Sequence, residues 1–135
     1  MAEGGADRTY LAKAAESLAG AEREFAEGAS NNCANRAYYA CFQAAIAALI
    51  RVGIGPSPRD HLWRHDAVQA QFNEQVINRR KLYPSNLRGT LETGSRLRNL
   101  ADYGTISVTE IQAARALRRA RAFVSAIGDS RGTVR

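Results

Sequence analysis

The stretch NRAYYACFQAAIAAL, residues 35–49, decides the fold. Its apolar residues recur at spacings of three and four, which is the pattern of a helix that buries one side. Alanine, the best helix former, occurs throughout it, and it contains no proline. We therefore predict a helix over residues 32–52, with Ser30, Asn31 and Asn32 as candidate caps at its start. The residues expected on its buried side are Ala34, Ala37, Tyr38, Cys41, Phe42, Ala45, Ala48 and Leu49.

Glycine, proline and serine divide the rest of the chain into further helical segments. We predict helices over residues 7–27, 66–80, 86–103 and 107–127. Their expected inward-facing residues include Val68, Phe72, Val76 and Ile77, then Leu87, Leu91, Gly94, Leu97 and Ala101, then Val108, Ile111, Ala113, Ala116, Leu117, Ala120, Val124 and Ile127. With no convincing strand, the sequence predicts an all-α, four- to five-helix up-and-down bundle. We expect one domain over residues 1–135, with its core at about 8–128 and a flexible tail at 129–135.

Local signals predict where several of these helices begin and end. Gly28 and Gly128 are expected to end the first and last helices, because glycine readily adopts the left-handed conformation of a C-cap. Ser107 and Glu110, three residues apart, predict a capping box at the start of the last helix. The prolines of the 53–60 segment exclude a helix there, so this segment is predicted to be the one substantial loop.

Composition points to a cytoplasmic protein. Cys33 and Cys41 lie eight residues apart on one predicted helix, roughly 12 Å along its axis, which is too far for a disulfide. A reducing compartment fits that usage best. No apolar run reaches the ~18 residues that span a bilayer, and the N-terminus has no secretory signal pattern. We expect a soluble, cytoplasmic protein that does not bind membranes.

The charge is distributed unevenly along the chain. Residues 1–78 contain 7 basic and 9 acidic side chains, whereas residues 79–135 contain 12 basic and 4 acidic ones. Arg115, Arg118 and Arg119 share one stripe of the last predicted helix. Such asymmetry indicates either a basic surface for a polyanion such as nucleic acid, or a solvated arginine-rich helix face.

Most enzyme and metal templates are absent. The chain has no glycine-rich phosphate loop and no nucleophile elbow. Its two histidines, His61 and His65, lack a third metal ligand nearby in the sequence, so we expect neither a metal nor a cofactor. His65 is expected to begin the third helix with its ring near a cleft.

Two polar groups could form a site. In SRLRNLADYG, residues 95–104, Arg96 and Tyr103 are two helical turns apart, and Arg98 and Asp102 are spaced for an i, i+4 ion pair. In the central helix, Arg36 and Tyr39 lie off the apolar stripe and are spaced for a stacked or hydrogen-bonded pair at an interface. The residues themselves predict no more than a polar cluster near a basic surface.

Taken together, NRAYYACFQAAIAAL, HDAVQAQF, RLRNLADYG and a last helix that ends AFVSAI resemble the HEPN (higher eukaryotes and prokaryotes nucleotide-binding) superfamily, in particular its small stand-alone prokaryotic members. The resemblance covers roughly residues 8–128 and implies a helical bundle. Many members are dimeric, metal-independent endoribonucleases, often toxins paired with a minimal nucleotidyltransferase. Their motif is Arg, four to six residues, then His, frequently followed two residues later by Tyr, which the partner can modify with AMP.

On this chain the motif falls on Arg96, Ala101 and Tyr103, with alanine in place of the histidine. The resemblance thus implies binding of RNA or a nucleotide at a dimer cleft, in a toxin–antitoxin-like or defence pair with a nucleotidyltransferase. The residues expected in that cleft are Arg96, Arg98, Asn99, Asp102 and Tyr103, with Arg36 and Tyr39 nearby, and Tyr103 is the candidate for modification.

Two alternatives stay open. The first is an active metal-independent endoribonuclease that uses Arg96 or Arg98 together with Asp102, His65 or Tyr103 as the proton acceptor. The absence of the motif histidine argues against it. The second is a purely structural helical protein whose basic helix docks on an acidic partner.

Overall fold

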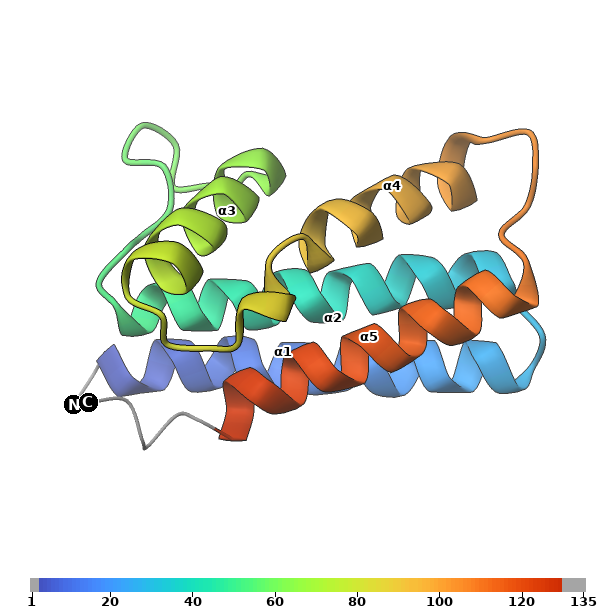
Figure 1. Cartoon of the computed structure of the whole chain (residues 1–135), viewed down its shortest axis with the longest axis horizontal. Coiled ribbons are helices and arrows are strands. Elements are labelled where there is room, and N and C mark those ends of the chain that lie inside the picture. Colours follow the sequence, from blue (N-terminus) through green and yellow to red (C-terminus); the bar gives the residue numbers. More distant parts are fainter. Residues whose placement is uncertain (1–2, 130–135) are drawn as a thin grey trace.

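A computed structural model describes residues 3–129. Four long helices alternate in direction along the chain: α1 (Glu3–Ala26), α2 (Ser30–Arg51), α4 (Thr90–Tyr103) and α5 (Glu110–Asp129). Between α2 and α4 lie α3 (His65–Gln71), the π-helix η1 (Phe72–Arg79) and the 3-10 turn η2 (Ser85–Leu87). The prediction of an all-α up-and-down bundle is confirmed (Figure 1).

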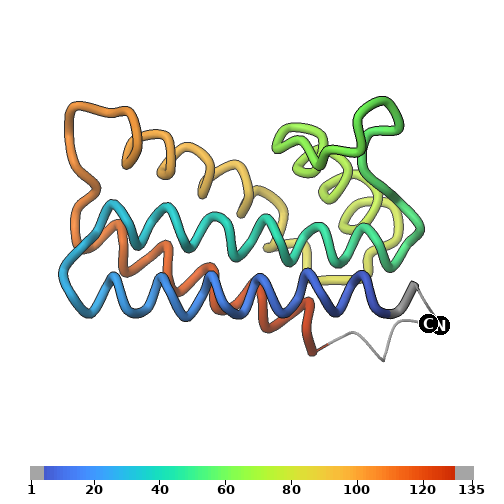
Figure 2. The backbone as a smooth tube through the Cα atoms, turned by 180° about the vertical axis from the view of Figure 1, so that it is seen from behind, coloured from blue at the N-terminus to red at the C-terminus, as the bar shows by residue number. Residues whose placement is uncertain are grey.

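The helix α2 is the centre of the bundle. It packs against α1 and α5 on one side and against α4, α3 and η1 on the other, as Figures 1 and 2 show from opposite sides. All eight residues predicted for its apolar stripe are buried, and so are five further residues on the helix, because neighbours cover it nearly all round. Seven of its thirteen buried residues are alanines, whose small side chains let the surrounding helices approach closely.

The turn from α1 to α2 follows the prediction at Gly28 but not at the start of α2. Gly28 has a φ of +77°, and Gly28 and Ala29 donate to the carbonyls of Phe25 and Glu24, which is a Schellman motif. The side chains of Asn31 and Asn32, however, do not cap α2. Asn31 instead accepts from Val108 N–H at 2.8 Å, and Asn32 donates to Glu24 at 3.2 Å. These two side chains therefore join elements that the sequence could not pair.

The last helix begins later than predicted. The predicted capping box of Ser107 and Glu110 is wrong, because Thr109 and Gln112 form the capping box instead. Thr109 Oγ1 accepts from Gln112 N–H at 3.1 Å, and Gln112 Oε1 accepts from Thr109 N–H at 2.9 Å. The cause is Val108, which is buried and bonded through its N–H to Asn31, so the backbone before residue 109 stays outside the helix. Gly128 does not end α5 either, because the helix continues to Asp129.

The middle segments also depart from the predicted single helices. Residues 66–80 begin as an α-helix but continue as the π-helix η1, whose wider turns suit the spacing of Phe72 and Ile77. Residues 86–103 are broken at Gly89, where φ is +90°, so that α4 starts only at Thr90.

The buried side chains form a single hydrophobic cluster that contains most of the residues predicted to face inward. The prediction that Ile111 faces inward is wrong, because its side chain is 66% exposed. Leu97, Ala101 and Val124 are only partly buried. Phe123 was not expected in the core but is fully buried. The predicted tail lies mostly outside the described residues, and its first residue, Asp129, is helical.

Candidate functional site

The helix α4 carries its two arginines of interest on different faces. Arg98 is directed toward α2, where its guanidinium carbon lies 5.3 Å from the ring centroid of Tyr38 and 5.7 Å from that of Tyr39. Arg96 lies with residues of α5 along a separate groove. A spacing of two residues on a helix turns side chains by about 200°, which accounts for the separation. Within one copy of the chain, Arg96 and Arg98 therefore lie on different faces of α4.

We call the side chains around Arg98 the Arg98 cluster: Asn35, Tyr38, Tyr39, Phe42, His65, Arg98 and Asp102. The predicted ion pair between Arg98 and Asp102 is present, at 3.4 Å. Asn35 Nδ2 donates to both oxygens of the same carboxylate, at 3.0 and 3.3 Å. The side chain of Arg98 is only 16% exposed, and its Nε is buried without a hydrogen-bond partner in the described part of the chain.

His65 joins this cluster through the tertiary structure. Its Nδ1 lies 2.6 Å from Tyr38 Oη, and its ring stacks on Phe42 with centroids 4.3 Å apart. Burial raises the pKa of Tyr38 to about 12, against a smaller opposite effect of Arg98. Burial, and secondly the positive charge of Arg98, lower the pKa of His65 from its usual value.

These two shifts define the charge states of Tyr38 and His65 at neutral pH. At neutral pH Tyr38 keeps its proton and His65 is uncharged, so the hydrogen bond between Tyr38 Oη and His65 Nδ1 joins two neutral groups. The other ring nitrogen, His65 Nε2, has no hydrogen-bond partner within residues 3–129. One nitrogen of an uncharged imidazole is therefore free to contact a ligand.

A second arrangement lies between α4 and α5, and we call it the α4–α5 groove. It is open, has a volume of ≈ 320 Å³, and is lined by Thr93, Arg96, Leu97, Leu100, Gln112, Arg115 and Arg119. Three of these seven residues are arginines and none is acidic. Arg96 forms an exposed i, i+4 pair with Glu92 at 2.9 Å, which contributes little to holding it in place. The groove is thus a basic surface with an apolar floor.

Exposed apolar side chains lie beside this groove, at the turn from α4 to α5. Tyr103 is 78% exposed, Ile106 72% and Ile111 66%. Asn99 is exposed on α4 as well. Large apolar side chains gathered in this way often mark a contact surface.

Arg36 and Tyr39 do not form the predicted pair. Tyr39 packs edge-on against Tyr38 and His65 in the Arg98 cluster. Arg36 lies over α1 instead, where its Cδ is 3.3 Å from the position that a Cβ on Gly20 would occupy. Arg36 is therefore placed away from both the cluster and the groove.

The sequence predicts only that the ring of His65 lies near a cleft and that Arg115 and Arg119 share a helix stripe, and it names no neighbours for them. The spacing of these residues along the chain does not predict their neighbours in the structure, because those neighbours belong to other helices.

Within residues 3–129, no group of three or more metal-ligating side chains is present. No helix in that range is long and apolar enough to cross a membrane. Cys33 and Cys41 both lie buried on α2 as free thiols.

Comparison with known proteins agrees with this architecture. A family model described as the HEPN domain matches residues 8–130, which is nearly the whole chain. No curated protein matches the chain. The family match and the helical bundle together connect the protein with nucleotide- or RNA-related functions. The chain belongs to the HEPN domain family.

Proposed function

We propose that this HEPN protein binds RNA or a nucleotide through the α4–α5 groove and does not cleave it. The observation that carries the proposal is the set of three arginines, Arg96, Arg115 and Arg119, in an open groove whose lining contains no acidic residue. Arginine binds phosphate through two parallel N–H groups, and such contacts supply most of the affinity for nucleic acid. Three of the basic side chains from the C-terminal half of the sequence therefore lie together in this groove.

Other residues near the groove supply recognition of a different kind. Asn99 is exposed on α4 and can form hydrogen bonds to a base or ribose, and Tyr103 can stack against a base. The Arg98 cluster borders the other side of α4, where His65 Nε2 has no hydrogen-bond partner in the described residues. Arg36 has no part in this arrangement, since it lies over α1.

Endoribonuclease activity is the second candidate, favoured by the approach of both His65 and Arg98 to Tyr38. Cleavage without a metal needs a base that accepts the 2′-hydroxyl proton and a cation that reaches the phosphorane. Ala101 stands at the position of the motif histidine, and Arg98 is largely enclosed and faces Asp102. Since the motif base is missing and the nearby cation is enclosed, we expect binding without cleavage.

We expect that exchanging both exposed arginines of the groove, Arg96→Gln with Arg115→Gln, raises the Kd for single-stranded RNA at least tenfold. Each lost phosphate contact should also reduce the slope of log K against log salt by about 0.7. Fluorescence anisotropy of a labelled oligonucleotide across a salt series measures both quantities. The matched control is Arg79→Gln with Arg80→Gln, which removes the same charge from exposed positions outside the groove.

Equal losses in the two double variants would show that net charge, and not the groove, attracts RNA. The absence of salt-sensitive binding in the unmodified protein would end the proposal. The same RNA incubated with the protein and EDTA should stay intact. Cleavage that disappears in the His65→Ala or Arg98→Ala variant would establish the nuclease instead.

We also propose a homodimer and a nucleotidyltransferase partner. The exposed Ile106 and Ile111 beside the groove support a contact between copies, and Ile106→Asp is expected to convert a dimer into a monomer in light scattering. The exposed hydroxyl-bearing ring of Tyr103 is accessible for transfer of AMP. Incubation with a nucleotidyltransferase and ATP should add one adenylyl group, as seen by mass spectrometry, and Tyr103→Phe should abolish the addition.

A further inference from the structure

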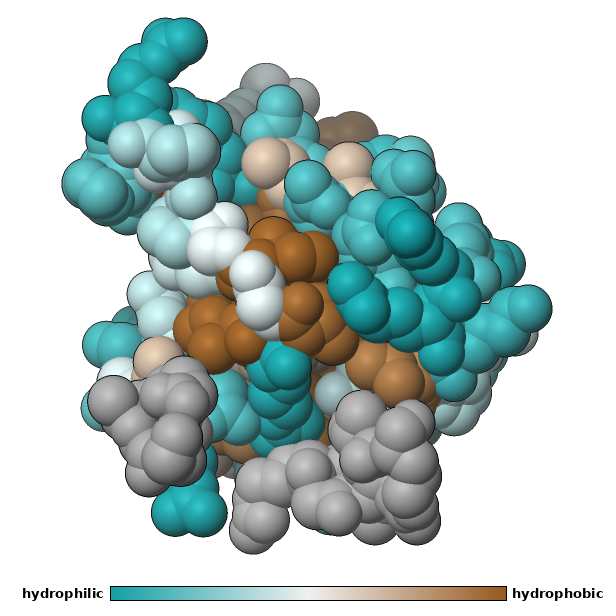
Figure 3. Space-filling model, turned by 90° about the vertical axis from the view of Figure 1, so that its left-hand side faces the viewer, coloured by the Kyte–Doolittle hydropathy of each residue, from teal (hydrophilic) through white to brown (hydrophobic). Residues whose placement is uncertain are grey.

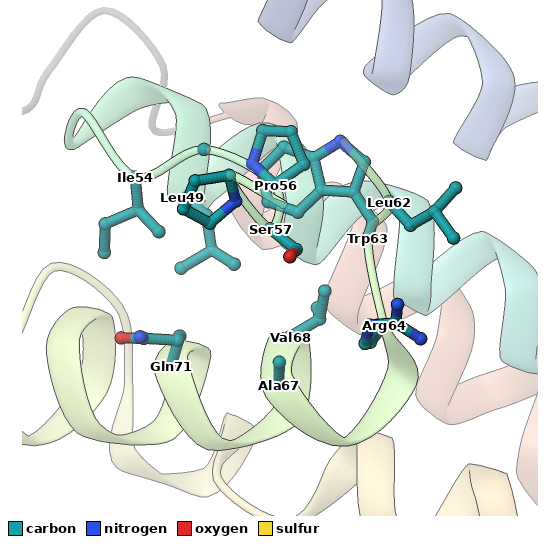
Figure 4. A pocket seen from close by; sticks show the side chains of 12 residues that line it. Leu49, Ile54, Pro56, Ser57, Leu62, Trp63, Arg64, Ala67, Val68 and Gln71 are labelled. Atoms are coloured by element: carbon teal, nitrogen blue, oxygen red, sulfur yellow. The ribbon is translucent and has the colours of Figure 1, made fainter. Parts of the chain in front are cut away.

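A separate pocket lies between the 53–64 loop and α3, and none of its lining residues belongs to the α4–α5 groove. Its volume is ≈ 180 Å³. Most of its lining is apolar: Leu49, Ile54, Pro56, Pro58, Leu62, Trp63, Ala67 and Val68. Figure 4 shows the loop residues Pro56 and Trp63 facing Ala67 and Val68 of α3 across the pocket, with Arg64 at one end. We call this the loop pocket.

The loop pocket is held in shape by the loop's own hydrogen bonds. Ser57 N–H donates to the Leu62 carbonyl at 3.0 Å, and His61 N–H donates to the Ser57 carbonyl at 2.7 Å. His61 has a φ of +61°, a left-handed conformation that is uncommon outside glycine and that closes the loop. The deep wall is rigid as well, because Leu49 and Val68 belong to the buried core. A ligand would thus enter a site that is already formed.

Exposed apolar surface marks the mouth of the pocket. Leu62 is 54% exposed, although it is a large apolar side chain in the pocket lining. The end of the molecule that carries the 53–64 loop shows apolar surface ringed by polar residues (Figure 3). A bound apolar group would remove part of this surface from water at roughly 25 cal/mol per Å².

The pocket continues into a wider polar basin lined by Ser57, Pro58, Arg59 and Arg64. Arg64 pairs with Asp60, which leaves one positive charge in excess among these side chains. That excess resides on Arg59, which is exposed and has no ion-pair partner in the described residues. The basin thus attracts one negative charge next to an apolar cavity.

We propose that the loop pocket binds a small carboxylic acid with an apolar body of one ring or one short branched chain. The apolar body occupies the space between Trp63 and Val68, and the carboxylate lies in the basin, where Arg59 donates to it and Arg64 adds a second contact. A volume of ≈ 180 Å³ is below that of pockets for drug-sized ligands, which sets the size limit.

The test uses Trp63, which is the only tryptophan of the chain, so its fluorescence reports on this pocket alone. Phenylacetate is expected to change the Trp63 emission saturably, with a matching heat in isothermal titration. Arg59→Gln should raise the Kd at least tenfold, and Ala67→Leu, which fills the cavity, should abolish binding. Arg80→Gln, an exposed arginine outside the pocket, is the control and should leave the Kd unchanged.

Two further ligands separate the contributions of charge and size. Phenylacetamide has the same ring but no charge and should bind at least tenfold more weakly. Phenyl phosphate tests whether the basin prefers a phosphate, and tighter binding of phenyl phosphate than of phenylacetate would overturn the assignment to a carboxylic acid. Equal affinity for the acid and the amide, or no saturable change with any of these probes, would overturn the proposal.

Discussion

The variant Asp7→Ala is expected to lose about 3–5 kcal/mol of unfolding free energy, which is the usual cost of leaving one charge of a buried pair without its partner. Asp7 Oδ2 accepts from Arg51 Nε at 2.8 Å, and both side chains are 11% exposed. Arg51 Nη1 also donates to the Ile127 carbonyl at 2.8 Å and to Tyr83 Oη at 3.3 Å. One guanidinium thus joins the start of α1, the end of α2 and the end of α5.

Urea unfolding followed by circular dichroism measures this loss. The exposed Glu16→Ala on the same helix is the control and should change the stability by less than about 0.5 kcal/mol. The double variant Asp7→Ala with Arg51→Met should lose less than the sum of the two single variants, because it leaves no buried charge unpaired. A loss below about 1 kcal/mol for Asp7→Ala would mean that Arg51 reaches water when its partner is removed.

The variant Phe123→Ala is expected to cost about 3–5 kcal/mol, from the lost burial and the cavity that remains. Phe123 is fully buried on α5 and packs against Phe72 of η1, with ring centroids 5.1 Å apart. Because domains of this size are stable by only about 5–15 kcal/mol, the variant should be partly unfolded well below the melting temperature of the unmodified protein.

Calorimetry or urea unfolding checks the Phe123 result. Arg118→Ala is the matched control, since it lies exposed on the same helix and should leave the stability nearly unchanged. Equal losses in the two variants would show that α5 is stabilised by its helical propensity and not by the aromatic contact with η1.

The fold could be predicted because the helical signals are local. The stripe from Ala34 to Leu49 and the glycine at position 28 act through neighbours three to five residues away, so they can be identified along the chain. Predictions that required a distant neighbour were less successful. The start of α5 depends on Asn31, which is 77 residues away from Val108, and no local pattern contains that contact.

The site was predicted only in part, for the same reason. The ion pair of Arg98 and Asp102 lies within one helix and was correctly expected. The pairing of Arg36 with Tyr39 was wrong, because Arg36 lies over Gly20 of α1 while Tyr39 contacts α3 and α4. Helical spacing gives the face on which a residue lies, but it does not give the element that covers that face.

By itself, the sequence determined the all-α bundle, its central helix and the basic character of the C-terminal half, because these depend on periodicity and composition. Only the tertiary structure decided that Arg96 and Arg98 belong to different faces of α4, that His65 reaches Tyr38, and that Arg115 and Arg119 complete a groove with Arg96. A side chain's chemical role depends on its neighbours in space, and in a helical bundle those neighbours come from helices far apart in the chain.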